Sequence, residues 1–502
     1  MSVTAQGPTE RDALRSARRT VELPRPLDDA PVGSSARLVT SLLANQLDLS
    51  LLGAVPAGER SETSLPLGLV GALERALEHN LGSQLQRSRT RSRSARRRQA
   101  RSRLLPVFDL TFEQRTDELN FDASAFARFR PPTPQGVTPE GVSGFQFFDA
   151  RVESRWLLFD RAAQLQLRSA RALERASKAG EQAVRSSLLL VTGNLYYRVA
   201  LLEKRLEVAR QRQTQAEAFE ELVDTGFESG LRTTTEQLAA EIAALEAERS
   251  TDVAEGELEK ARLRLAQTIG LPLGQRFHLL DGVRYTPMRQ LTLAEGVAQA
   301  LASRGDVAAL REELGAARAE LAATRARRLP SVEIEADWGE IGPTASDRRS
   351  TYGFAALASL PLFRGGELAA ERVEAAEEVR LLEQRLGALE AQIHYQLAEG
   401  LIDERTTDRL VRLAQRTVEL SARRQVEVLE RFDAGVADSL DVLAARTELA
   451  AAQGRELDAL LAHRTAKGAV ARALGLDERT LLDILRAETQ TPSEPNRSGE
   501  SE

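Results

Sequence analysis

The chain has 502 residues, with 68 lysines and arginines, 74 aspartates and glutamates, and a net charge of −6. Proteins that bind nucleic acid over their whole surface carry a large excess of basic residues. The near balance of charges excludes this class. Because the chain contains no cysteine, disulfides, thiolate catalysis and Cys-ligated zinc are excluded as well.

The two ends of the chain are rich in proline, serine and charged residues. Residues 1–64 and 477–502 resemble nothing else in the sequence, and we expect both segments to be disordered. Residues 1–30 show no apolar stretch of the kind that a signal peptide has. No run of 18 apolar residues occurs, so the sequence predicts no transmembrane helix.

Between its ends the sequence is a tandem duplication with a period of about 200 residues. Residues 226–240 (GFESGLRTTTEQLAA) match 431–445 (RFDAGVADSLDVLAA) at an offset of 205, and residues 67–112 match 291–336 at an offset of 224. We therefore expect a first repeat at 65–270, an equatorial connection at 271–290 and a second repeat at 291–476.

Each repeat contains a very long helical segment with apolar residues spaced three and four apart, as in a coiled coil. Residues 160–227 would form a helix of roughly 100 Å, and 231–269 with 293–328 would return along it end to end. The second long segment, 364–432, has a shorter return at 436–474. Residues 67–103 would supply the piece that is missing there.

Four shorter segments alternate apolar and polar residues, at about 104–116, 145–159, 329–341 and 351–363. Segments of about ten residues with one apolar and one charged face suit strands of a membrane β-barrel. The alternative is an ordinary soluble sheet. Four strands do not close a barrel, whereas three copies of the chain would give twelve. We expect a membrane belt formed by the aromatic side chains Phe108, Phe112, Phe148, Trp156, Trp338, Tyr352 and Phe354.

Several short motifs, repeated in the same order, resemble the outer-membrane factor (TolC-like) family over about residues 65–476. They include Ala76-Leu77 with Asn80, the Leu-Pro pairs before the strands, and the Leu-Phe pairs after them. The most specific is Phe432-x-x-Gly435 followed by Ser439, Asp441 and Ala445.

The resemblance implies a mainly helical protein with long antiparallel helical hairpins and four transmembrane strands per chain, closed into a barrel by homotrimerisation. It implies an outer-membrane exit duct with a periplasmic tunnel, in a tripartite efflux or type I secretion system. The partners implied are a periplasmic adaptor protein, an inner-membrane efflux pump or ABC transporter, and outer-membrane lipid. The family catalyses no reaction, and we expect no catalytic residue, metal or cofactor.

The resemblance places the periplasmic tip at about 227–236 and 432–441, where glycines permit chain reversal. We expect Thr234 and Ser439 to cap the returning helices. The acids Glu236 and Asp441 either form a cation-favouring ring in three copies or complement helix N-termini. The residues expected at the gate and the adaptor contact are Phe227, Gly230, Arg232, Thr234, Glu236, Phe432, Gly435, Ser439 and Asp441.

Two features admit other interpretations. Residues 87–103 hold nine arginines and read alone as a nucleic-acid segment, but their counterpart 311–327 is a plain amphipathic helix. We expect a solvated helix face near the barrel and no nucleic acid as partner. A cytoplasmic coiled-coil scaffold with a soluble sheet is the alternative function, and the missing signal peptide favours it.

Overall fold

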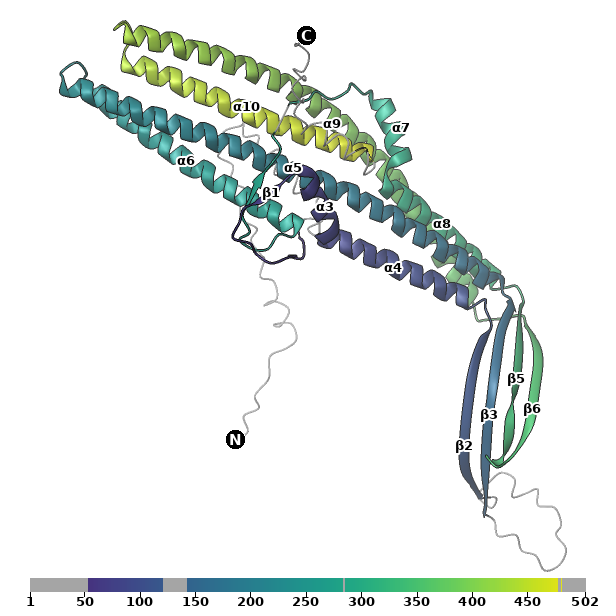
Figure 1. Cartoon of the computed structure of the whole chain (residues 1–502). Coiled ribbons are helices and arrows are strands. Elements are labelled where there is room, and N and C mark those ends of the chain that lie inside the picture. The colour runs from purple at the N-terminus through teal and green to yellow at the C-terminus, as the bar shows by residue number, and fades with distance from the viewer. Residues whose placement is uncertain (1–52, 121–141, 283–284, 477–479, 481–502) are drawn as a thin grey trace, which may run out of the picture. The chain divides into compact units, whose positions relative to one another are not determined.

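The computed structural model describes residues 53–120, 142–282, 285–476 and 480 (Figure 1). Residues 1–52 and 121–141 and nearly all of the predicted C-terminal tail lie outside this part of the chain. Within it, no helix is both long enough and apolar enough to cross a membrane.

The fold is mainly helical, as predicted, and two long hairpins dominate it (Figure 1). The first hairpin joins α5 (Arg161–Glu228) to α6 (Thr234–Ile269), and the second joins α9 (Glu367–Asp433) to α10 (Ser439–Leu474). Shorter helices complete the architecture: α3 (Leu69–His79), α4 (Leu81–Ser102), α7 (Leu293–Ser303) and α8 (Gly305–Ala326).

The helices nearest the sheet pack side by side in the order α4-α5-α8-α9. Helix α8 lies between the two long helices, and α4 lies along the far side of α5. The prediction that 67–103 would complete the second repeat is therefore wrong within one chain, because α4 packs on the long helix of its own repeat. At the other end of the hairpins α10 packs on both α9 and α5.

The four predicted strands form one antiparallel sheet in the order β2-β3-β5-β6. Their bounds are Val107–Asn120, Val142–Phe159, Ser331–Thr344 and Asp347–Ser359. The register pairs Phe112 with Ala150, Val152 with Trp338, and Trp338 with Tyr352. Because directly paired residues share a face, the alternating apolar positions of all four strands lie on one side of the sheet.

The apolar face is open in the single chain. The exposed fractions are 68% for Phe108, 69% for Phe112, 63% for Trp338, 84% for Tyr352, 72% for Phe354 and 39% for Trp156. Phe148 differs from the predicted belt: it is 5% exposed, and its ring packs edge-on against Phe112 at 5.3 Å. Alternation reveals the face of a residue but not whether a neighbouring ring covers it.

The opposite face of the sheet carries ion pairs across its strands. Arg151 on β3 contacts Asp149 on the same strand and Asp337 on β5 (3.4 Å), and Arg155 contacts Asp109 on β2 (3.5 Å). This face is therefore charged, in agreement with the predicted alternation.

A small parallel pair, β1 (Leu65–Leu67) and β4 (Phe277–Leu279), ties the predicted connection to the start of the first repeat. The prediction that 1–64 is disordered is wrong for 53–64. In this stretch the N–H groups of Val55 and Ala57 donate to His79 and Gly270, and Ala54 pairs with Asn80. The segment has few apolar residues and gains its order from these backbone hydrogen bonds.

The duplication is visible in two helix breaks that lie 224 residues apart. The break at Asn80 separates α3 from α4, and the break at Arg304 separates α7 from α8. Asn80 is fully buried and caps α4 by accepting from Gly82 N (2.9 Å). Arg304 instead makes an ion pair with Asp306 (2.6 Å). The break is shared, but its chemistry has diverged.

Tyr196 joins α5 to the small parallel sheet and offers a test of this region. It is fully buried, its hydroxyl lies 3.0 Å from Leu67 O and 3.1 Å from the Asp281 carboxylate, and burial raises its pKa. Tyr196→Phe should lower the free energy of unfolding by about 1–2 kcal/mol, because Leu67 O loses a buried donor. Thermal unfolding followed by far-UV circular dichroism measures this change. The matched control is Tyr395→Phe at a 74% exposed position, and equal losses in both variants would contradict the assignment.

Candidate functional site at the helical hairpin tips

Helix α5 ends in a left-handed glycine turn. Gly230 has φ 70°, its N–H donates to Phe227 O (2.9 Å), and Leu231 N–H donates to Gly226 O (2.8 Å). These two bonds form a Schellman motif, in which carbonyls of the last helical turn gain donors. The predicted reversal at Gly230 is therefore present, because glycine adopts this φ without steric cost.

Helix α9 ends in the same way. Gly435 has φ 73°, its N–H donates to Phe432 O (2.9 Å), and Val436 N–H donates to Arg431 O (2.8 Å). The two turns are related by the 205-residue offset. The repeat alignment thus located both glycines correctly.

The helices that leave these turns are capped one residue earlier than predicted. Thr233, not Thr234, caps α6 in a capping box with Glu236. Asp438, not Ser439, caps α10 by accepting from Asp441 N (2.9 Å). Adjacent hydroxyl and acidic residues make the cap ambiguous in the sequence, because each of them suits an N-cap.

The two hairpins meet through Arg232, Glu236, Phe432 and Ser439, which we call the tip cluster. Ser439 Oγ donates to Glu236 Oε1 from the other hairpin. Arg232 Nη1 lies 3.2 Å from the same oxygen, and its guanidinium lies 4.3 Å from the centre of the Phe432 ring. Glu236 therefore holds its own turn and the neighbouring hairpin together.

An apolar layer lies beneath the tip cluster. Phe219, Val223, Ala240, Phe432 and Val442 come from all four helices and are at most 7% exposed. The rings of Phe219 and Phe432 are 5.8 Å apart, and the Arg446 guanidinium lies 4.6 Å from the centre of the Phe219 ring. Phe432 is thus an anchor between the hairpins.

The two turns differ by an exchange of large and small residues. A Cβ atom at Gly226 would lie 2.7 Å from Arg232 Cγ, so the glycine leaves room for this arginine. At the equivalent positions the second turn has Arg431 and Ala437. Arginine is thus present in both turns but on opposite sides of the reversal, and only the first turn directs it onto Phe432.

The charge on Glu236 is strongly stabilised. Its bond from Ser439, together with those from Thr233 and Arg232, lowers its pKa to about 2 from an ordinary value of 4.5. The side chain therefore stays ionised down to strongly acidic pH. These bonds favour the interpretation of Glu236 as a first-turn acid, and Asp441 likewise lies in the first turn of α10.

The remaining predicted tip residues lie outside the tip cluster. Phe227, Thr234 and Asp441 are exposed, and the two glycines form the turns. The sequence analysis missed Leu231 and Val436, which follow the glycines and are 80% and 68% exposed. The repeat alignment could have identified them, because the offset of 205 relates the two residues and each repeat places an apolar residue directly after the glycine of its turn.

A second cluster lies where the connection crosses the helices, far from the tips along the sequence. Among the described residues, ligand atoms of Glu404, Asp408 and His463 lie within 4.8 Å of one another, a spacing that a metal ion could occupy. Asp408 already accepts from Tyr285 and pairs with Arg412. The sequence analysis expected no metal and did not identify this group.

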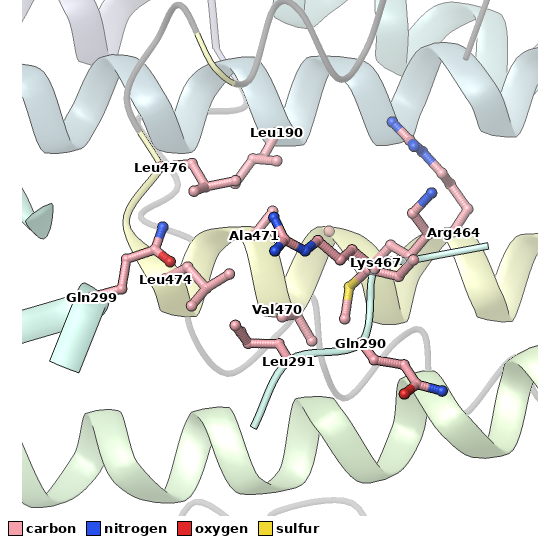
Figure 2. Close-up of a pocket in the computed structure, with 13 residues that line it drawn as sticks. Leu190, Gln290, Leu291, Gln299, Arg464, Lys467, Val470, Ala471, Leu474 and Leu476 are labelled. Carbon is pink, nitrogen blue, oxygen red and sulfur yellow. The ribbon is translucent and has the colours of Figure 1, made fainter. Parts of the chain in front are cut away.

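An apolar cavity of about 230 Å³ lies beside this cluster, between α5, α10 and the connection (Figure 2). Leu190, Leu291, Val470 and Leu474 line it, and Lys467 and Arg464 lie at one end. Lys467 Nζ donates to Thr286 O (2.9 Å), and burial lowers the pKa of Lys467 to about 8. These contacts fasten the connection to α10.

The low pKa of Glu236 predicts how stability depends on pH. Because its folded pKa lies below the unfolded value, its carboxylate stabilises the fold above about pH 4.5, and this contribution is lost as the pH falls toward about 2. The difference in melting temperature between wild type and Glu236→Gln should therefore shrink as the pH falls through this range. A difference that stays constant would contradict the ionised bridge.

The anchor role of Phe432 predicts an asymmetry between the two equivalent phenylalanines. Phe432→Ala should cost about 3–4 kcal/mol in unfolding free energy, because it leaves a cavity between the hairpins. Phe227→Ala should cost much less, because Phe227 is 36% exposed. Denaturant titration of both variants measures the difference, and similar costs would show that the hairpins do not depend on Phe432.

Comparison with known proteins agrees with this architecture. The family profile described as outer membrane efflux protein matches residues 72–271 and 296–476, which are the two repeats. Two sequence relatives, both named pyoverdine export outer membrane protein OpmQ, are 27% identical over 60% of the chain (Pseudomonas putida) and 28% identical over 62% of it (Pseudomonas aeruginosa). The aligned regions span 64% and 66% of these relatives.

Solved structures show the same fold. The Campylobacter jejuni CmeC outer membrane channel superposes with a TM-score of 0.70 at 16% identity, over 92% of this chain and 98% of that one. A membrane protein from Pseudomonas aeruginosa gives a TM-score of 0.70 at 17% identity, over 84% of this chain and all of that one. Because the family profile covers both repeats, the chain belongs to the outer membrane efflux protein family, whose members reside in the outer membrane.

Proposed function

We propose that the protein is a passive exit duct of an efflux system, through which a solute leaves the periplasm. The observation that carries this proposal is the family match across both repeats, on a chain whose sheet has one exposed apolar face and one charged face. An apolar outer face and a polar inner face are what a water-filled membrane barrel requires.

The sheet supports a homotrimer. Strands β2 and β6 form its two edges, and unpaired backbone groups are not tolerated in lipid. Pairing β2 of one copy with β6 of the next would satisfy both edges and give a barrel of twelve strands from three chains. The exposed aromatic rings would then form the lipid-facing belt.

The hairpin tips are the proposed site of gating and of contact with a periplasmic adaptor. Leu231 and Val436 project from the two turns and expose apolar surface that a partner would cover. Phe227, Thr234 and Asp441 are exposed beside them, whereas the tip cluster holds the hairpins of one chain together.

An inner-membrane pump or ABC transporter would supply the energy, and type I secretion is a second setting for the same duct. The two sequence relatives are named for pyoverdine export, so small secreted molecules are the first cargo to test. The alternative of a cytoplasmic scaffold is less well supported, because it would leave the aromatic face of the sheet in water.

Fractionation of cells that express the gene with its native upstream sequence tests the proposal. We expect the protein in the outer membrane, and unheated gel electrophoresis should show an SDS-resistant trimer. Recovery as a soluble monomer would overturn the export duct.

A matched pair of variants tests which face meets lipid. Phe112→Arg places a charge on the apolar face and should reduce assembly into the outer membrane, since a midplane arginine costs about 2–4 kcal/mol in such barrels. Thr111→Arg, one residue away on the charged face, should assemble normally. Equal assembly of both variants would show that the apolar face does not meet lipid.

A further inference from the structure

The arginine-rich helix α4 and the start of α9 occupy the two open flanks of the chain. Helix α4 leads into the edge strand β2, and the edge strand β6 leads into α9. The helices next to the sheet follow the same order as the strands, with α4 at one end and α9 at the other. A neighbouring copy that paired β2 with β6 would therefore bring its α4 beside this chain's α9.

Helix α4 carries a charge that its own chain does not neutralise. Residues 87–103 hold nine arginines and no acid. Arg97 reaches Glu174 on α5 (2.5 Å), whereas six of the nine arginines are exposed. On α5, residues 161–181 hold five basic side chains and two acidic ones. Because like charges repel, this face of α4 suits an acidic partner.

The start of α9 is acidic. Residues 367–390 hold seven glutamates and three arginines. Three of these glutamates already pair with arginines of α8 or with its C-cap Arg327, in the contacts Arg327–Glu371 (2.5 Å), Arg318–Glu383 (2.7 Å) and Arg311–Glu390 (3.4 Å). Glu367, Glu374 and Glu377 lie elsewhere on the helix and are exposed, and Glu377 also pairs with Arg380 of the same helix (2.6 Å).

The contact between α8 and α5 within the chain provides a template for the missing contact. Ala323 and Ala326 of α8 pack against Ala162 and Leu165 of α5 in one buried cluster. The buried stripe continues along both helices with Ala316, Ala319, Ser169 and Ala172. In each helix these residues are spaced three and four apart, as in a coiled-coil seam.

The duplication transfers this template to α4 and α9. The offset of 224 relates the α8 stripe to Ser92, Ala95, Gln99 and Ser102 of α4. The offset of 205 relates the α5 stripe to Glu367, Ala370, Glu374 and Glu377 of α9. All eight equivalents are exposed in the single chain, although their counterparts are buried.

We propose that arginines of α4 in one copy pair with glutamates in residues 367–390 of α9 in the next copy, where closure of the proposed trimer sets the two helices side by side and antiparallel. This interface rests on the proposed trimer and specifies which surfaces join. The template register sets Gln99 against Ala370 and Ala95 against Glu374. Arg91 and Arg98 flank the α4 stripe on one side, and Arg96 flanks it on the other.

The charges also explain why α9 joins α4 of the next copy and not α8. Three glutamates lie in the α9 stripe, where the equivalent α5 stripe has alanines and a serine. Burying those carboxylates without partners would be costly, and α4 supplies guanidinium groups on both sides of the stripe. The acidic stripe thus selects α4 over α8, whose equivalent positions include Glu313 and Glu320.

Disulfide trapping tests the register directly, because the chain has no cysteine of its own. Gln99→Cys with Ala370→Cys should form covalent links between copies under mild oxidation. The control pair, Gln99→Cys with Leu381→Cys, moves the second cysteine about 16 Å along α9 and should link far less. Neither pair can close within one chain, because α5 and α8 separate α4 from α9.

Charge reversal tests the electrostatics. Arg96→Glu with Arg98→Glu should lower the SDS-resistant trimer fraction by about tenfold, because acids would then face acids. Adding Glu374→Arg and Glu377→Arg should restore most of the trimer, and Arg96→Lys with Arg98→Lys should keep it.

The outcomes separate the two proposals. An unmodified protein that forms no trimer would overturn the proposed function. A normal trimer in which Gln99→Cys with Ala370→Cys links no better than the control pair would overturn this interface alone, as would a charge swap that fails to restore the trimer.

Discussion

The architecture depends on matching helix lengths. Each long helix must be covered along its full length, and an uncovered stretch would leave an apolar seam in water. Helix α5 is covered by α6 at one end and by α8 at the other, and α4 packs on the side of α5 that faces away from α8. Because α6 and α8 are separate helices, the chain between them must leave the helical column and return.

This departure from the helical column accounts for the contacts between the connection and the middle of the long helices. The connection runs along β4, Tyr196 and the buried polar network around His463 before α7 begins. Burial favours such a network only when its polar groups find partners. Thr286 provides one such partner, because its carbonyl accepts from Lys467. The preceding residue, Tyr285, donates a hydrogen bond from its hydroxyl to Asp408.

The sequence predicted features that depend on period and repetition. The helix reversals at Gly230 and Gly435, the faces of the four strands and the long helices follow from spacing and repetition. The caps at Thr233 and Asp438 were displaced by one residue, because neighbouring side chains offer equivalent acceptors. The burial of Phe148 depends on the Phe112 ring of the neighbouring strand β2. Periodicity along one strand does not predict such a contact.

Contacts between distant segments were the hardest to predict. Ser439 bonds Glu236 across 203 residues, and Asp408 meets His463 from a different helix. No local pattern links these residues, since their proximity arises only after the hairpins pack. The order of 53–64 has the same origin, because its partners lie near residues 79 and 270.

The exchange of Gly226 and Arg232 for Arg431 and Ala437 gives the two hairpins of one chain different ends. In a ring of three chains, the six ends would therefore alternate between two kinds. A partner with sixfold symmetry would meet two different kinds of binding position, and a partner with threefold symmetry would have to bind one kind only. In the proposed duct, the duplication would thus supply two docking positions per chain, which the differences at Gly226 and Arg431 and at Arg232 and Ala437 make distinguishable.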